Sequence, residues 1–196
     1  MDASSTSNRQ RIISAARDLF YQQGYNATSF SDIAQRADIP RGNFYYYFKS
    51  KDEILDGVID SWLELGRANL KELEQVSPEP CERLRAFVRS RLPMLDSIQR
   101  YGCPYGSLVT ELRKDNNEED LRGHARELFD LYLSWLENQF RAMGHKDDAE
   151  MFALHVMGRL QGASVMTNTC QQAGYFENEI ALLEDWIDKA CEGERP

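Results

Sequence analysis

Apolar residues recur every three or four positions along most of this 196-residue chain, and this spacing restricts the fold more than any other feature. An amphipathic α-helix has that period, whereas a half-buried strand alternates apolar and polar residues. We find no segment with the period of a strand, no internal repeat and no low-complexity tract. The chain is therefore expected to be all-α, with about nine helices.

The first two expected helices are separated by a short turn. The first ends at Gly24, since glycine is common just after the end of a helix. Either Thr28 or Ser29 is expected to cap the second helix, and Asp32 stands three residues after Ser29, as in a capping box. The second helix is short and is expected to end near Ala37.

The third helix is also short, and a clear start signal for the fourth follows it. Pro40 is expected at its first position, where proline is favoured. Phe44 and Phe48 share its inner face. A capping box from Ser50 to Glu53 then begins a fourth helix that is expected to run to about residue 76.

Five more amphipathic segments complete the chain. Pro93 is expected to kink the first of them, because proline disturbs a helix interior. The segments are a helix through Leu84, Phe87, Val88, Leu92 and Leu95, a helix through Leu108 and Leu112, and helices over about 118–143, 147–174 and 177–191.

Charge is distributed unevenly between the two ends of the chain. The formal net charge is −9, which by itself argues against a protein that coats nucleic acid. Residues 1–51, however, hold seven basic and four acidic residues, a net charge of +3, so the rest carries −12. Three helices in this basic segment, the last two short, suggest a helix-turn-helix. We expect a DNA-binding domain over 1–51 and an all-helical domain over 52–196.

Several segments within residues 9–60 resemble the TetR-type (TetR/AcrR) family of transcriptional regulators. They are Arg11-Ile12-Ile13-Ser14-Ala15-Ala16-Arg17-Asp18-Leu19-Phe20, Gly24-Tyr25-Asn26-Ala27-Thr28-Ser29, Asp32-Ile33-Ala34 and Arg41-Gly42-Asn43-Phe44-Tyr45-Tyr46-Tyr47-Phe48-Lys49-Ser50-Lys51. The last one resembles the family's recognition helix and the cap of the next helix. Pro40 departs from the pattern, since the family often has serine there.

The resemblance implies a set of DNA contacts, in which phosphate contacts position the protein and base contacts select the sequence. Arg41 would reach a guanine edge or a phosphate, and Gly42 would let the backbone approach the duplex. The implied set is Thr28, Ser29, Arg41, Gly42, Asn43, Tyr45, Tyr46, Tyr47 and Lys51. The alternative is that the aromatic run from Phe44 to Phe48 is mainly core.

The resemblance also implies a pocket for a small apolar or aromatic effector in the helical body. Candidate lining residues are Trp62, Phe87, Tyr101, Cys103, Tyr105, Phe129, Tyr132, His155 and Met157, each of which could instead be core. Cys103 has a second interpretation, because some relatives carry an electrophile-sensing cysteine near this point. A thiol-sensing repressor is thus an alternative to a ligand-responsive one, and the other interpretation of Cys103 is a buried residue in a tight turn.

The last two helices are expected to form a homodimer, which would bind a palindromic operator as a repressor. Two glycines on one helix face cost stability unless close packing recovers it. The candidate interface residues are Gly158, Gly162, Val165, Met166, Leu182, Leu183 and Trp186, with packing inside one chain as the alternative.

Other classes of protein lack support in the sequence. We find no catalytic motif, so an enzyme on a helical scaffold is a remote alternative, and we expect no catalytic residue, metal or cofactor. Four distant cysteines without a CxxC pair fit neither a zinc site nor a disulfide scaffold. With no signal peptide or membrane span in the sequence, a cytoplasmic protein is expected.

Overall fold

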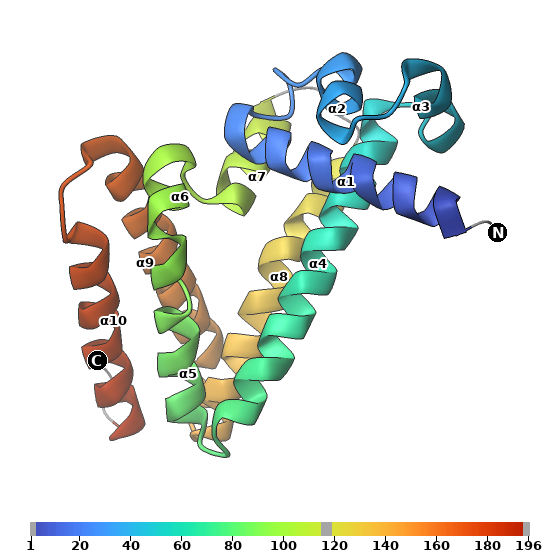
Figure 1. Ribbon diagram of the computed structural model, residues 1–196. Helices are drawn as coiled ribbons and strands as arrows, with labels where there is room; N and C mark the ends of the chain where they lie inside the picture. The colour runs from blue at the N-terminus through green and yellow to red at the C-terminus, as the bar shows by residue number, and fades with distance from the viewer. Residues whose placement is uncertain (1–2, 115–118, 194–196) are drawn as a thin grey trace. The chain divides into compact units, whose positions relative to one another are not determined.

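The computed structural model describes residues 3–114 and 119–193, with side chains described for all of these except 3–7, 41–42 and 119–120. Within these ranges the chain has no strand, which confirms the all-α class (Figure 1). The elements are α1 (Ala3–Gln23), α2 (Phe30–Ala37), α3 (Arg41–Tyr47), α4 (Lys51–Val76), α5 (Pro80–Arg89), η1 (Leu92–Met94), α6 (Leu95–Tyr101), α7 (Pro104–Lys114), α8 (Glu119–Ala142), α9 (Ala149–Cys170) and α10 (Tyr175–Cys191). No described helix is both long enough and apolar enough to cross a bilayer.

A complete capping box begins α2, and Ser29 is its N-cap. The Ser29 hydroxyl accepts the backbone N–H of Asp32 at 3.2 Å, and the Asp32 carboxylate accepts the backbone N–H of Ser29 at 2.8 Å. Two N–H groups that have no partner within the helix are thereby satisfied. The helix ends at Asp38, which adopts a left-handed conformation with φ of 52°.

The starts of α3 and α4 lie within one residue of the expected positions. Pro40 was expected to be the first helical residue of α3, but it is the N-cap, and the helix begins one residue later at Arg41. At α4, the Ser50 hydroxyl accepts the N–H of Glu53 at 3.1 Å. In an ordinary capping box the Glu53 carboxylate would accept the N–H of the N-cap residue, Ser50. Here it accepts the N–H of the preceding residue, Lys49, at 2.6 Å.

Pro93 breaks the expected fifth helix instead of only kinking it. Because proline has no N–H and its ring crowds the preceding turn, α5 ends at Arg89. A 3₁₀ turn, Leu92–Met94, contains the proline, and α6 begins at Leu95. Within the described ranges, this division accounts for ten α-helices where nine periodic segments were expected.

The helices pack into two compact units that do not follow the expected boundary at residue 51. The first unit holds Met1–Leu65 and Pro104–Leu128, and the second holds Gly66–Cys103 and Phe129–Pro196. Packing therefore groups α7 with α1–α3, and the boundary at residue 51 stays a prediction about function. Fully buried side chains fill each unit, including Ile12, Ile33, Phe44, Phe48, Ile54 and Leu112 in the first and Leu84, Phe87, Phe140 and Phe176 in the second.

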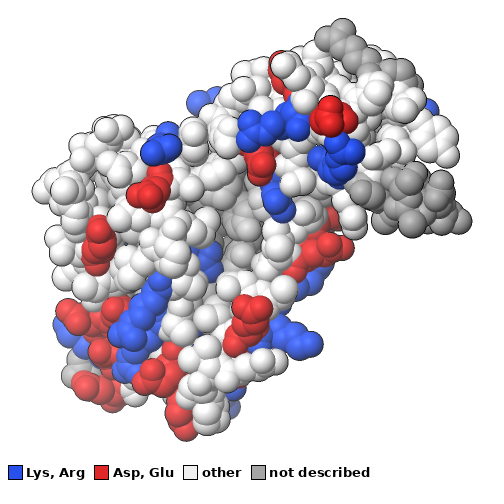
Figure 2. Space-filling view, viewed as in Figure 1, with Lys and Arg blue, Asp and Glu red and all other residues white. Residues whose placement is uncertain are grey.

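In the second unit a disulfide links α5 to α10, which the cysteine spacing did not indicate. Cys81 and Cys191 are 110 residues apart in sequence, with Cα atoms 6.0 Å apart. Arg85 lies near this bond and pairs with Glu82 and Asp188, both at 2.6 Å. Figure 2 shows both signs of charge on the visible face over α5 and α10, as such cross-helix pairs require.

Candidate nucleic-acid interface

The aromatic run of α3 divides into a buried pair and an exposed pair. Phe44 and Phe48 are each 2% exposed, which confirms that they belong to the core. Tyr45 and Tyr46 are 57% and 77% exposed. Two large aromatic rings on a short exposed helix, each with a hydroxyl, can contact phosphates and base edges. The alternative of an all-core run therefore fails for these two tyrosines.

Neighbouring contacts hold the exposed tyrosines in place. The Tyr45 ring lies 5.8 Å from that of Phe30, and the Tyr46 ring meets that of Tyr47 edge-on at 5.2 Å. The Tyr47 hydroxyl accepts the side-chain N–H of Asn8 at 3.3 Å, which fixes it against α1.

Three further residues of α3 belong to the implied set of DNA contacts, and the structure describes the side chain of one of them, Asn43. Asn43 is exposed on the first turn of α3. The contacts expected of Arg41 and Gly42 lie outside the residues whose side chains are described.

Thr28 and Ser29 were assigned the same role, but their surroundings differ. Thr28 is 1% exposed, its hydroxyl donates to the Gly24 carbonyl at 2.7 Å, and it accepts from Gln23 at 3.2 Å. Its hydroxyl therefore holds the turn together and is not presented to a phosphate, which corrects the expectation for Thr28. Ser29 is exposed at the N-terminus of α2, where a phosphate is favoured.

Lys51 also contacts the turn between α1 and α2. Its ammonium donates to the carbonyls of Tyr25 at 3.0 Å and Thr28 at 3.2 Å, and lies 4.2 Å from the centre of the Tyr25 ring. An ammonium has three N–H donors, so two carbonyl bonds do not exhaust its capacity for a phosphate.

Tyr25 connects the same turn to the start of α4. Its ring is buried and its hydroxyl donates to the Asp52 carboxylate. Burial raises the pKa of Tyr25 well above its usual value, and the hydrogen bond to the Asp52 anion raises it further. The Tyr25 phenol therefore stays protonated near neutral pH and donates its hydrogen bond to Asp52.

Sequence reasoning missed Glu111, which meets the turn from α7. Its carboxylate accepts the backbone N–H groups of Tyr25 at 2.9 Å and Asn26 at 2.7 Å. A single glutamate in an amphipathic helix carries no motif, so only the folded chain shows this contact.

The candidate effector residues belong to both compact units. Trp62 and Tyr105 meet edge-on at 5.5 Å in the first unit. In the second unit, the Phe87 ring lies 5.9 Å from that of Tyr132, and Arg91 covers both rings. Tyr101 and Phe129 are partly exposed, and Met157 is 8% exposed.

Cys103 and His155 have specific partners in the second unit. The Gln161 side-chain N–H donates to the Cys103 sulfur at 3.3 Å. His155 does not lie with Phe87 and Tyr132, as a common pocket would require, but stacks on Trp186 at 4.4 Å on the surface of α9 and α10. This placement associates His155 with the candidate dimer face.

The outer face of α9 and α10 carries exposed apolar side chains among polar ones. Leu154, Val165 and Leu182 are 53%, 61% and 54% exposed, and Met166 is 44% exposed. Leu183 was expected on this face, but it is only 2% exposed and packs within its own chain. It is therefore not part of the exposed face. Several exposed large apolar side chains on one pair of helices favour an interaction site.

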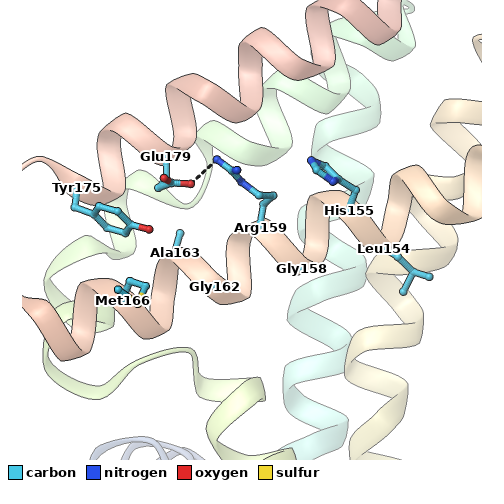
Figure 3. Close-up of a pocket in the computed structure, with 9 residues that line it drawn as sticks. All are labelled: Leu154, His155, Gly158, Arg159, Gly162, Ala163, Met166, Tyr175 and Glu179. Carbon is cyan, nitrogen blue, oxygen red and sulfur yellow. Dashed lines mark hydrogen bonds and ion pairs between the residues drawn. The ribbon is translucent and has the colours of Figure 1, made fainter. Parts of the chain in front are cut away.

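A groove of about 440 Å³ crosses this face (Figure 3). Gly158 and Gly162 lie along it, and a Cβ added to either would meet nothing within 4 Å among the described residues. The packing of the chain itself therefore does not explain these glycines. Arg159 spans the groove to Glu179 at 2.5 Å.

The described residues include no group of three or more His, Cys, Asp or Glu placed to hold a metal ion. They do include two exposed tyrosines on the short helix α3 and, in the second unit, exposed apolar side chains on α9 and α10.

Comparisons with known proteins agree with this arrangement. Residues 12–58 match the family model described as bacterial regulatory proteins, tetR family. An uncharacterized HTH-type transcriptional regulator of Lactococcus lactis is 30% identical over 94% of this chain and 95% of its own length. The regulator LmrA of Bacillus subtilis is 25% identical over 93% and 97%. A crystal structure of a TetR transcriptional regulator from Legionella pneumophila superposes with a TM-score of 0.81, at 20% identity over 95% and 98% of the two chains.

Proposed function

Because this chain belongs to the TetR family of bacterial regulatory proteins, we propose that it is a ligand-responsive repressor. It binds a palindromic operator as a homodimer and is released by a small apolar or aromatic effector. Its relatives are named as transcriptional regulators, and we propose that this chain likewise has no catalytic activity and works on DNA in the cytoplasm.

The exposure of Tyr45 and Tyr46 is the observation that carries this proposal. An isolated soluble domain gains nothing from presenting two tyrosines on a short helix whose phenylalanines are buried. A DNA duplex offers both a phosphate row for the hydroxyls and base edges in the major groove. The expected roles of Asn43, Ser29 and Lys51 fit the same surface.

The exposed face of α9 and α10 supports the homodimer. A two-fold dimer uses the same patch on both subunits, so one apolar face is enough to make the interface. Gly158 and Gly162 would let the partner's helix approach closely, which recovers the stability that glycine costs inside a helix. Two helix-turn-helix heads then match operator half-sites about 34–36 Å apart.

The effector acts by changing the population of two dimer states. A ligand shifts such an equilibrium only as far as its affinities for the two states differ. Aromatic clusters such as Phe87 with Tyr132 and Trp62 with Tyr105 offer the surface for an apolar or aromatic compound. Binding there would favour a dimer whose heads are wrongly spaced for DNA.

Substitution of the exposed tyrosines tests this function. The wild-type protein is used to select an operator from a pool of random duplexes, and its Kd is measured by fluorescence anisotropy. We expect Tyr45→Ala to bind this duplex at least about tenfold more weakly, the equivalent of 1.4 kcal/mol. Its melting temperature should stay close to that of the wild type, because the ring is 57% exposed.

Leu65→Ala is the matched control, because Leu65 is 53% exposed and lies outside α3. It should bind like the wild type. Normal operator affinity in a folded Tyr45→Ala variant would refute the assignment of α3.

Thiol sensing at Cys103 is the second candidate function. The observation that favours it is that Cys103 is a partly exposed cysteine outside any disulfide, and its sulfur accepts a side-chain N–H from Gln161 at 3.3 Å. Treatment with N-ethylmaleimide should then release the wild type, but not Cys103→Ser, from the selected duplex. Equal behaviour of the two proteins would remove this candidate.

A further inference from the structure

We propose that Glu111 is a positioning residue that couples α7 to the DNA-reading helices. The proposal rests on the proposed function, since it concerns how the reading head is held for the operator. Glu111 lies on α7 (Pro104–Lys114), far along the chain from the helix-turn-helix but within the same compact unit.

The first support is the geometry of the carboxylate. Each oxygen accepts one backbone N–H, Oε2 from Tyr25 at 2.9 Å and Oε1 from Asn26 at 2.7 Å. Two charge-assisted bonds from successive amides fix both the distance and the orientation of the turn. A displacement of α7 by even an ångström would therefore pull the turn with it or break both bonds.

Gly24 is the second support, because its conformation and the space beside it both suit the carboxylate. Its φ is +91°, a conformation that side chains other than glycine rarely adopt. A Cβ there would lie 3.2 Å from both Glu111 oxygens. Glycine at this position thus removes the atom that would crowd the carboxylate.

The third support is that a cation also holds the turn, through its carbonyl oxygens. Lys51 of α4 donates to the carbonyls of Tyr25 and Thr28. The peptide groups of the turn therefore direct their N–H ends to an anion on α7 and their C=O ends to a cation on α4. The turn leads directly into α2, whose N-cap is Ser29, so its position sets the position of the reading head.

The start of α7 makes it a suitable carrier of a signal. Tyr105, in the first turn of α7, is a candidate effector contact, and its ring meets that of Trp62 edge-on at 5.5 Å within the same unit. Glu111 is six residues beyond Tyr105, about 9 Å along a rigid helix. A compound that displaces the start of α7 would act on the turn through Glu111.

The test replaces Glu111, because loss of its negative charge and loss of its positioning role should change DNA affinity in opposite directions. Removing a carboxylate from a DNA-binding unit should by electrostatics alone strengthen binding to a polyanion. The positioning role predicts the opposite: Glu111→Ala binds the selected duplex about tenfold more weakly, within the range of measured couplings between sites. Glu111→Gln, which keeps one acceptor oxygen, should fall between Glu111→Ala and the wild type.

Two further readouts separate positioning from direct contact. The salt dependence of binding should be unchanged in Glu111→Ala, because no phosphate contact is lost. Hydrogen exchange of the Tyr25 and Asn26 amides should be faster in this variant. Glu64→Gln is the matched control, since Glu64 is an exposed carboxylate of the same unit, and it should bind as tightly as the wild type or slightly more tightly.

Each result has a defined meaning. Equal or tighter operator binding by folded Glu111→Ala, or unchanged exchange of the two amides, overturns the proposal. If Glu111→Ala does not fold, Glu111→Gln is judged against Glu64→Gln by the same criteria. A wild-type protein that selects no duplex from the random pool defeats the proposed function instead, so the two failures are distinguishable.

Discussion

Thr28 and Ser29 show that neighbouring hydroxyl residues can have opposite roles. Their sequence context, just before a short helix, suits a phosphate contact for both. In the fold, the Thr28 side chain turns inward to the Gly24 carbonyl, whereas Ser29 caps α2 at the surface. The sequence does not distinguish them because the direction of a side chain in a turn depends on contacts made after the chain has folded.

Substitution of these two residues should therefore affect different properties. Thr28→Val leaves the partly buried Gly24 carbonyl without the Thr28 hydroxyl, which should lower the free energy of unfolding by about 1–3 kcal/mol. Urea denaturation measures this change. Ser29→Ala should cost only about 1 kcal/mol, the usual loss for an N-cap. Weaker operator binding with unchanged stability in Thr28→Val would restore Thr28 as a phosphate ligand.

His155 provides a pH prediction. Burial lowers its pKa below the usual 6.5, and the nearby Arg159 cation lowers it further. The folded chain thus disfavours the imidazolium, so this contribution to stability is complete above pH 6.5 and is lost as the pH falls through the lowered pKa.

The urea midpoint of the wild type should therefore drop more between pH 7 and pH 5 than that of His155→Gln. The charged groups near His155 on α9 and α10 include Arg159, Asp185 and Lys189, which both proteins retain. Identical pH profiles for the two proteins would contradict the prediction.

At the scale of helices, patterns within a few consecutive residues predicted where helices begin, whereas contacts between residues far apart in sequence were not predicted. The cap at Ser50 was predicted, and the cap of α2 was predicted to be Thr28 or Ser29, because a capping box lies within four consecutive residues. The packing of α10 against α5 brings together Cys81 and Cys191, which lie 110 residues apart, and no local pattern encodes their meeting. Pro93 was recognised as a disturbance, but whether a proline kinks or ends a helix depends on the packing on both sides of it.

The disulfide should contribute measurably to stability. Closing a long loop restricts the unfolded chain, and removing such a bond typically costs about 2–4 kcal/mol. We expect Cys191→Ser to lower the urea midpoint, and dithiothreitol to lower that of the wild type to the same value. Cys170→Ser is the matched control, since Cys170 is an exposed cysteine without a disulfide. A wild-type midpoint that does not respond to dithiothreitol would argue against the bond.

At the scale of the whole molecule, the net charge of −9 hides a division between the two ends of the chain. Residues 1–51 carry +3 and the remainder carries −12, and this division follows from the order of the amino acids alone. The family, the helical class and the exposed α3 tyrosines were likewise predictable, because they depend on motif and period. Glu111 and the buried Thr28 were not, since they depend on segments that meet only in the fold.

The charge division predicts strong salt dependence of operator binding. A protein that neutralises about six phosphates loses on the order of 10³ in affinity between 50 and 200 mM salt. We expect a fall of this order for the wild type on its selected duplex, measured by anisotropy. Lys51→Gln should reduce the slope by about one, because Lys51 is one of the expected phosphate contacts. An operator affinity that is independent of salt would contradict the role of the basic segment.

The bonds from Glu111 to the turn bear on the engineering of hybrid regulators. An exchange of reading heads between two such proteins, cut at residue 51, would leave the amides of Tyr25 and Asn26 facing a foreign α7. The graft would keep every residue that we propose contacts DNA and still lose the Glu111 carboxylate that we propose positions the turn. A chimera should therefore carry Pro104–Lys114 together with the head, so that the transplanted module is discontinuous in sequence.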